Sequence, residues 1–284
     1  MMSPMLVTPR TGGDRASLLN QLRQVETDLK NVRGAGGTAG DLFNAYLLWV
    51  ANAVRVLRFQ VRENEMEALV LTKRYWTLQA MSSGPAGMVR ELVEVEIDDR
   101  LTFFEATIQT TQAEFERWDR AELLVVADTS FYHHHPQKLD EVDLSKVLES
   151  RHQSIGLVIP MVVVDELESQ KRSSNKVVRS RSQVTLAVIE RVARYDGAGR
   201  LRDSDFSPID RGELPSGEIW LEVLFDQPGH VRLSINDDEI VDRALAVQIL
   251  SGKDLTFLTY DTNQALRARH AGLSHVRHLR HERS

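Results

Sequence analysis

Cysteine is missing from the sequence, so disulfide bonds and thiolate metal sites are excluded. Any bound metal must be held by oxygen or imidazole ligands. The absence is also compatible with a reducing compartment, and we expect a cytoplasmic protein. Apolar runs of the roughly 18–20 residues that a membrane-spanning helix needs are missing too, and the N-terminus lacks the charged-then-apolar layout of a signal peptide. We therefore expect no membrane partner.

An excess of positive charge is also lacking, since the formal net charge is −6. This balance excludes a protein that coats nucleic acid through bulk positive charge. A nucleic-acid enzyme of this composition must concentrate its basic residues locally. The length of 284 residues allows either one large domain or two ordinary ones with sizeable cores.

Strand signals are absent from residues 1–120, where apolar residues recur at steps of three and four, the period of an α-helix. A glycine-rich stretch separates the first two predicted helices, and residues 82–85 interrupt the pattern before the last one. We predict an all-helical region whose apolar faces form its core and which carries no chemistry. The predicted helices cover residues 17–32, residues 41–79, and a segment with apolar residues from Ile97 to Trp118 on one face.

From residue 121 onward, short runs of β-branched residues alternate with helical patterns. This alternation predicts an α/β domain, residues 121–284, with a mostly parallel sheet covered on both faces. Residues 217–235 interrupt the alternation and resemble an inserted β-hairpin with its turn at 226–229. The predicted strands are 123–127, 157–159, 255–259 and 274–279, and the predicted helices are 161–172, 176–195, 237–251 and 262–271.

Acidic residues follow the predicted strands of this half. Asp128 and Asp261 come directly after strands, Glu166 lies on the helix after another strand, and Asp237 and Asp238 open a helix. Sites in parallel sheets form at the carboxyl edge. Carboxylates gathered there repel each other unless a cation lies among them, and Mg²⁺ prefers oxygen ligands. Each residue alone is typical of a helix cap or a solvated side chain, but together they favour a metal site.

These motifs occur in an order that resembles the PIN domain, over roughly residues 121–280. The resemblance implies a three-layer α/β/α fold and an Mg²⁺- or Mn²⁺-dependent endoribonuclease. It also implies that metal is bound by Asp128, Glu166, Asp237 and Asp261, with Asp238 as the alternative to Asp237. The long segment 217–235 is similar to that of the larger PIN type. The resembling segments are Asp128, residues 160–168, residues 236–240 and residues 259–266.

On this hypothesis, a metal-activated water hydrolyses the RNA phosphodiester bond, and Glu166 is a metal ligand or a general base. One alternative is a non-catalytic module that binds RNA or protein, with the N-terminal helices as the interface to a partner or to a second copy. The other is a phosphatase with Asp128 as nucleophile. That chemistry generally needs a second acid two residues on, where this sequence has Ser130.

A basic run lies within eleven residues that contain no acid, and we predict that it positions the RNA backbone, although such a run also suits a solvated face. Polar residues beside the acids are predicted either to donate hydrogen bonds to metal-bound water or phosphate or to cap helices: Thr129, Ser130, Thr259 and Asn263. We expect residues 133–135, three consecutive histidines, in an exposed loop, because they cannot all face one ion. The basic run consists of Lys171, Arg172, Lys176, Arg179 and Arg181.

Overall fold

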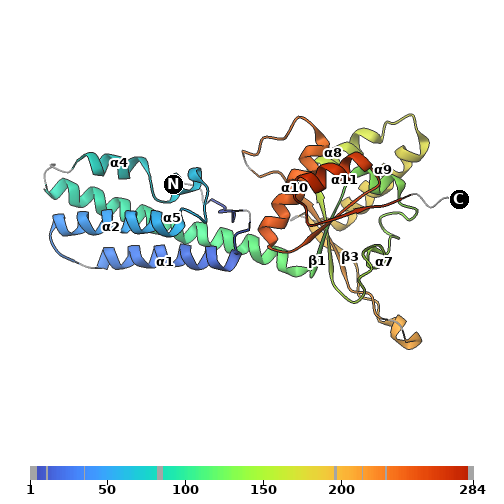
Figure 1. Ribbon diagram of the computed structural model, residues 1–284, viewed down its shortest axis with the longest axis horizontal. Helices are drawn as coiled ribbons and strands as arrows, with labels where there is room; N and C mark the ends of the chain where they lie inside the picture. Colours follow the sequence, from blue (N-terminus) through green and yellow to red (C-terminus); the bar gives the residue numbers. More distant parts are fainter. Residues whose placement is uncertain are drawn as a thin grey trace. The chain divides into compact units, whose positions relative to one another are not determined.

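The computed structural model of the chain describes residues 5–10, 12–34, 36–81, 86–194, 197–212, 214–227 and 229–280. These residues form two units, Met1–Trp118 and Asp119–Ser284, and each unit has its own apolar core (Figure 1). Among the helices described, none is both long and apolar enough to cross a membrane.

The first unit is built from helices, which confirms the helical prediction for this region. The single helix predicted for residues 41–79 is wrong, however, because the chain breaks after Leu57 and again after Leu69. The interruption predicted at 82–85 lies outside the described residues. The helices are α1 (Arg15–Gly34), α2 (Ala39–Leu57), α3 (Glu63–Leu69), α4 (Lys73–Ala80) and α5 (Ala86–Arg117), followed by a 3₁₀ turn, η1 (Trp118–Arg120).

Side-chain caps divide the predicted long helix. Glu65 Oε2 accepts a hydrogen bond from the backbone N–H of Arg62 (2.7 Å) at the start of α3. Thr72 Oγ1 accepts one from the backbone N–H of Tyr75 (3.0 Å) at the start of α4. Such caps satisfy N–H groups that have no partner in the first turn of a helix. The caps are polar side chains, so they leave the spacing of apolar residues unchanged. For this reason the apolar period predicted one continuous helix across both breaks.

The second unit is a six-stranded sheet in the order β3-β4-β2-β1-β5-β6. Every neighbouring pair is parallel except β3 and β4. Helices α8 and α10 pack against β2, and α9 packs against β3 and β4. The predicted α/β fold is confirmed. The strands are β1 (Leu123–Ala127), β2 (Ile155–Pro160), β3 (Ala198–Arg202), β4 (Ile219–Leu224), β5 (Leu255–Thr259) and β6 (His275–His278). The helices are α6 (Thr129–His134), α7 (Leu144–Leu148), α8 (Met161–Gln170), α9 (Lys176–Val192), η2 (Ser207–Arg211), α10 (Asn236–Ser251) and α11 (Thr262–His270).

The hairpin predicted for residues 217–235 is wrong. Its first half is β4, a strand inside the sheet that pairs in parallel with β2, and residues 230–235 form no strand. The antiparallel partner of β4 is β3, which no sequence pattern predicted because its five residues include one large apolar side chain and lie half-exposed at the sheet edge. Residue 228 of the predicted turn lies outside the described residues.

The central strands should dominate the stability of this unit. Leu157 lies on β2, where its side chain is fully buried, whereas Leu266 on α11 is 58% exposed. We predict that Leu157→Ala lowers the free energy of unfolding by about 2–5 kcal/mol, because it leaves a cavity between packed strands. Leu266→Ala is the matched control and should change it by less than about 0.5 kcal/mol. Urea denaturation measures both, and equal effects would contradict the assigned core.

Candidate active site

Two acidic residues follow neighbouring strands of the sheet. Asp128 follows β1 and Asp261 follows the parallel strand β5, and the backbone N–H of Asp128 donates to the carbonyl oxygen of Leu258 (3.1 Å). Each also starts a helix. Asp128 Oδ1 accepts from the backbone N–H of Phe131 (3.1 Å), and Asp261 Oδ1 accepts from that of Asn263 (2.7 Å). Both residues are therefore helix caps placed at the carboxyl edge of the sheet.

Glu166 joins this edge from α8, the helix that follows β2. Its Oε1 accepts a hydrogen bond from Asn236 Nδ2 (2.8 Å), and its Oε2 accepts one from Thr129 Oγ1. Thr129 is the first residue of α6, and Asn236 is the first residue of α10 and precedes Asp237. The contacts of Glu166 thus draw together the starts of α6 and α10, and with them Asp128 and Asp237.

Burial and like charge act on these acids together. Asp128 is 4% exposed, and burial raises its pKa to about 6, although hydrogen bonds from Ser130 and Thr259 oppose the rise and the charge of Asp261 adds to it. The pKa of Asp237 is also raised, first by burial and then by Glu166, while Arg267 opposes the rise and Asp261 again adds to it. Because Asp261 acts on both residues and Glu166 acts on Asp237, the four carboxylates belong to one electrostatic cluster.

Hydroxyl groups hold both oxygens of Asp128. Ser130 Oγ donates to Oδ1 (2.6 Å) and Thr259 Oγ1 donates to Oδ2 (2.6 Å). The same hydroxyl oxygens accept from backbone N–H groups, Ser130 from Tyr260 (2.8 Å) and Thr259 from Asp261 (2.8 Å). In this structure Thr129, Ser130 and Thr259 therefore donate to carboxylates. Asn263 contributes its backbone N–H to the cap at Asp261.

Asp237 and Asp238 differ in what holds them. The carboxylate of Asp238 forms an ion pair with Arg267 of α11. The carboxylate of Asp237 has no hydrogen-bond or ion-pair partner among the described residues, and its backbone oxygen accepts from Gln264 Nε2 (3.0 Å). Asp237 is the acid left open to a ligand, which favours it over Asp238 as the third metal-binding residue.

The donor set suits a hard divalent cation. It consists of carboxylate oxygens, and the protein has no cysteine to add a thiolate. Burial and the charges of neighbouring acids raise the pKa of both Asp128 and Asp237. A cation among them would relieve the repulsion, and Mg²⁺ and Mn²⁺ prefer such oxygen ligands. The chemistry of the donor set therefore fits a hard cation. Among the described residues, however, no three of these acids have ligand atoms within 4.8 Å of one another, so an ion here would draw its ligands closer or keep water between itself and some of them. Asp238 is held apart by Arg267.

A second group of metal-ligand atoms lies in the same unit but is already neutralised. Ligand atoms of Asp226, His230 and Glu239 lie within 4.8 Å of one another. Glu239 Oε1 lies 2.7 Å from His230 Nε2 and 3.3 Å from Arg243 Nε, and Asp226 pairs with Arg232 (2.6 Å). Two guanidinium groups beside the cluster repel a cation, so we interpret it as an anchor for the segment before α10.

The predicted RNA-binding residues span the loop after α8 and the first turns of α9, where three of the five have structural contacts. Lys171 pairs with Glu168 (2.9 Å), Arg179 donates to the carbonyl oxygen of Ser173 (2.6 Å), and Arg181 donates to those of residues 136 and 137 (2.8 and 2.9 Å). Arg172 and Lys176 make no such contact among the described residues and remain available for phosphate.

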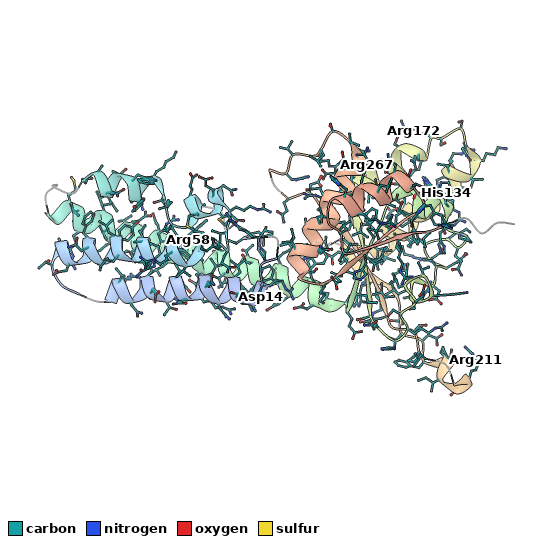
Figure 2. The ribbon with its side chains drawn as sticks, in the orientation of Figure 1. Asp14, Arg58, His134, Arg172, Arg211 and Arg267 are labelled. Atoms are coloured by element: carbon teal, nitrogen blue, oxygen red, sulfur yellow. The ribbon has the colours of Figure 1, made fainter. Side chains whose placement is uncertain are left out.

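Figure 2 places one residue of the basic run, Arg172 in the loop between α8 and α9, toward the same end of the second unit as Arg267, which holds Asp238. Arg211 is drawn at the opposite end.

The three consecutive histidines are not in the exposed loop that we expected. His133 and His134 form the last turn of α6, and His135 ends it. His133 Nε2 lies 3.0 Å from Ser182 Oγ of α9, and burial lowers the pKa of both His133 and His135. The cap at Asp128 starts a helix that is too short to produce a readable period.

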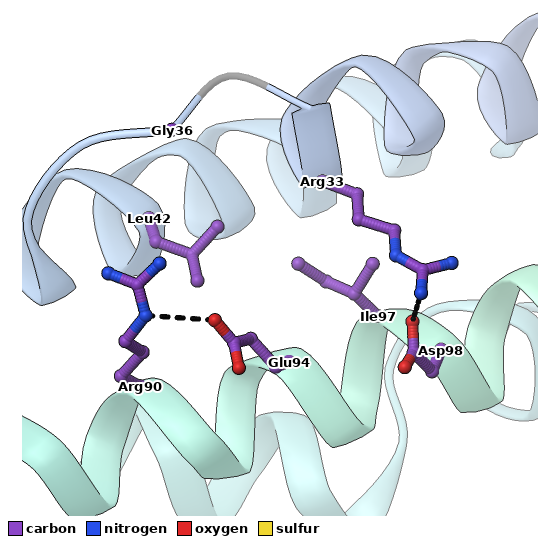
Figure 3. A pocket seen from close by; sticks show the side chains of 7 residues that line it. All are labelled: Arg33, Gly36, Leu42, Arg90, Glu94, Ile97 and Asp98. Carbon is purple, nitrogen blue, oxygen red and sulfur yellow. Dashed lines mark hydrogen bonds and ion pairs between the residues drawn. The ribbon is translucent and has the colours of Figure 1, made fainter.

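The first unit contains a cavity but no comparable acidic cluster among its described residues. The cavity, of about 200 Å³, lies between the loop after α1, the start of α2 and α5 (Figure 3). Its charges are neutralised in pairs, Arg33 with Asp98 (3.1 Å) and Arg90 with Glu94 (2.8 Å). Leu42 and Ile97 complete the lining, and no charged group of the lining is left over for catalysis.

Two residues of the site escaped sequence reasoning. Asn236 belongs to the motif at residues 236–240, but only the structure shows that its side chain donates to Glu166. Arg267, which holds Asp238, carries no sequence signal, because its role depends on the packing of α11 against α10.

A family model described as PIN domain matches residues 125–278, which is more than half of the chain. The match begins within β1 and ends with β6, so it covers Asp128, Glu166, Asp237, Asp238 and Asp261. No curated protein matches the chain.

The raised pKa of Asp128 predicts a pH dependence of stability in metal-free buffer. A carboxyl whose folded pKa, about 6, exceeds its ordinary value of 3.8 stabilises the fold fully below 3.8, and this contribution is lost as the pH rises through about 6. The loss is on the order of 2–3 kcal/mol. Asp128→Asn has no such loss, so its free energy of unfolding should rise relative to that of the wild type between pH 4 and 6.

Urea denaturation with EDTA at intervals of pH measures this difference. Asp210→Asn, on the exposed turn η2, is the control and should differ from the wild type by a constant amount. A constant difference for Asp128→Asn as well would show that the pKa of Asp128 is not raised.

Proposed function

The chain belongs to the PIN-domain family, and we propose that its acidic site is the centre of an Mg²⁺- or Mn²⁺-dependent endoribonuclease. PIN domains are generally nucleases, so hydrolysis of a phosphodiester is the chemistry to derive. The observation that carries the proposal is Asp237, a carboxylate with a raised pKa and no partner among the described residues, beside three further acids.

The residues present would divide the work as follows. Asp128, Asp237 and Asp261 would hold the cation, which when bound supplies a lowered pKa for a water and neutralises charge on the phosphodiester. Glu166 is either a further ligand or the base that accepts the proton of the attacking water. Thr129 and Asn236 each donate to one of its oxygens, so its carboxylate is oriented before substrate arrives.

Preorganisation extends to the other acids. Ser130 and Thr259 fix the two oxygens of Asp128, so this carboxylate cannot rotate when a ligand binds. Arg267 keeps Asp238 out of the site. Its positive charge also opposes the rise in the pKa of Asp237 and so favours the ionised form of that acid. Water attacks phosphorus, the bond to the leaving oxygen breaks, and Arg172 and Lys176 would hold neighbouring phosphates in place.

Asp237 and Asp238 offer a matched pair of variants for this proposal. We predict that purified wild-type protein cleaves labelled single-stranded RNA with Mn²⁺ or Mg²⁺ and not with EDTA. Asp237→Asn should lower the cleavage rate by at least about 100-fold, because it removes a charge that the cation needs. Asp238→Asn makes the same chemical change one residue away and should retain most of the activity, because that carboxylate is bound to Arg267.

Denaturing gels over a time course measure the rates, and circular dichroism checks that both variants fold. RNA binding by the wild type without cleavage, with Mg²⁺ or Mn²⁺ present, would support the non-catalytic binding module. Equal loss in both variants would refute the separate roles of the two acids.

The basic residues give a second prediction. Because the chain is acidic overall, attraction of RNA must be local. Arg172→Ala combined with Lys176→Ala should weaken binding to all RNA sequences alike. It should also reduce the slope of log affinity against log salt by about 0.7 for each lost phosphate contact.

Arg191→Ala is the control, since Arg191 lies in the last turn of the same helix as Lys176, about 22 Å away along its axis. Fluorescence anisotropy at several salt concentrations, with Asp128→Asn present to prevent cleavage, gives the slopes. An unchanged slope in the double variant would mean that these side chains form only a solvated face.

A further inference from the structure

The segment between β4 and α10, residues 225–235, departs from the usual arrangement of apolar side chains inside and charged ones outside. Among its described residues, charged side chains make the contacts to the neighbouring helices. Arg232 pairs with Asp226 (2.6 Å) and with Asp165 of α8 (2.5 Å). His230 Nε2 lies 2.7 Å from Oε1 of Glu239, which is fully buried on α10. The segment is therefore tied to both α8 and α10 through ion pairs and hydrogen bonds.

Its apolar side chains face outward. Val231, Leu233 and Ile235 alternate with polar residues and are 83%, 47% and 47% exposed, and Phe225 is 53% exposed. Phe225 lies against Gly197, where a Cβ atom would come within 2.4 Å of its ring. The missing side chain at Gly197 lets the ring rest on backbone while about half of Phe225 stays open to solvent. Four large apolar side chains of one segment are thus exposed to solvent.

The segment that carries these side chains leads to the acidic site. The segment starts at the carboxyl end of β4, beside Pro160 of β2, and ends at Asn236, whose side chain binds Glu166. A pocket of about 280 Å³ between α8 and the segment is lined by Glu166, Arg232 and Asn236 among others. Since β4 lies two strands from β1, Phe225 follows a strand that is about 10 Å from the one that ends at Asp128.

A ligand at the acidic site would therefore lie beside the end of this segment. RNA offers two kinds of surface, phosphates and the flat faces of bases. The guanidinium of Arg232 is shared by two carboxylates, so the segment carries no free positive charge to attract phosphate. Apolar side chains and an open aromatic ring match the base faces, because a base stacks on an aromatic side chain whatever its identity.

We propose that Phe225 and residues 229–235 form a base-binding surface for the RNA nucleotides that flank the cleaved bond, with Phe225 as the stacking platform. The proposal rests on the proposed nuclease function. It assigns the two halves of a nucleotide to different parts of the unit, phosphates to Arg172 and Lys176 and bases to the segment before α10.

The test measures RNA binding in full-length protein that carries Asp128→Asn, so that the RNA stays intact. Phe225→Ala should weaken binding of a single-stranded oligonucleotide about tenfold and leave its salt slope unchanged, because no phosphate contact is lost. Phe225→Trp should restore the affinity. The matched control is Phe206→Ala, a comparably exposed phenylalanine (65%) just before η2, the turn that carries Arg211 at the opposite end of the unit.

A second measurement separates stacking from structural effects. Oligonucleotides that each lack one base should identify the position that stacks on Phe225. Removal of the base at that position should weaken binding to the protein with Phe225 and leave binding to the Phe225→Ala variant unchanged. A fluorescent 2-aminopurine at that position should be quenched on binding only when residue 225 is aromatic.

Several outcomes would overturn the proposal. Unchanged affinity in Phe225→Ala would do so, as would equal losses at every abasic position in both proteins. Concentration-dependent self-association that Phe225→Ala abolishes, with RNA affinity intact, would instead assign the surface to protein contact. These results leave cleavage by the wild type in place and so refute this inference alone. Absence of both RNA binding and cleavage in the wild type would refute the nuclease function and this inference together.

Discussion

Negative charge gathered at one edge of a parallel sheet is the constraint on which the rest of the second unit depends. Strands β1 and β5 are neighbours and each ends in an aspartate, while α8 and α10 bring Glu166 and Asp237 to the same edge. Burial and mutual repulsion oppose ionisation there. The surrounding hydrogen bonds offset that repulsion. Asp128 accepts from two hydroxyl groups, and Asp261 accepts from backbone N–H groups. Glu166 accepts from the side chains of Thr129 and Asn236.

This arrangement gives single residues two roles. Asp128 and Asp261 cap α6 and α11, so each stabilises a helix and also presents an oxygen at the sheet edge. The capping role is therefore compatible with the proposed metal-binding role. Asp237 has no such partner, and the neighbouring Asp238 is bound to Arg267. The open carboxylate is the place where a cation improves the electrostatic balance of the unit most directly.

Recognition of RNA by an acidic chain has to be divided among local surfaces. Of the basic run, Lys171, Arg179 and Arg181 make contacts within the protein, and the proposal assigns phosphate to Arg172 and Lys176. The segment before α10 places its charges in ion pairs and its apolar side chains in solvent, and the proposal assigns the bases to it. On this view the net charge of −6 limits unspecific binding, because attraction exists only near the site.

The sequence by itself determined the fold class and the candidate acids, because each depends on short-range pattern. The buried strands from Leu123, Ile155 and Leu255 have β-branched runs, and the acids that follow them must meet where parallel strands end. Tertiary structure alone decided which groups hold one another. The period of residues 41–79 did not reveal the caps at Arg62 and Thr72, and β3 is stabilised by pairing with β4 and has no pattern of its own. Asn236 reaches Glu166 across 70 residues of sequence, and Arg267 reaches Asp238 across 29. Long-range partners are set by helix packing, which leaves no trace in local periodicity, and so the choice between Asp237 and Asp238 required the structure.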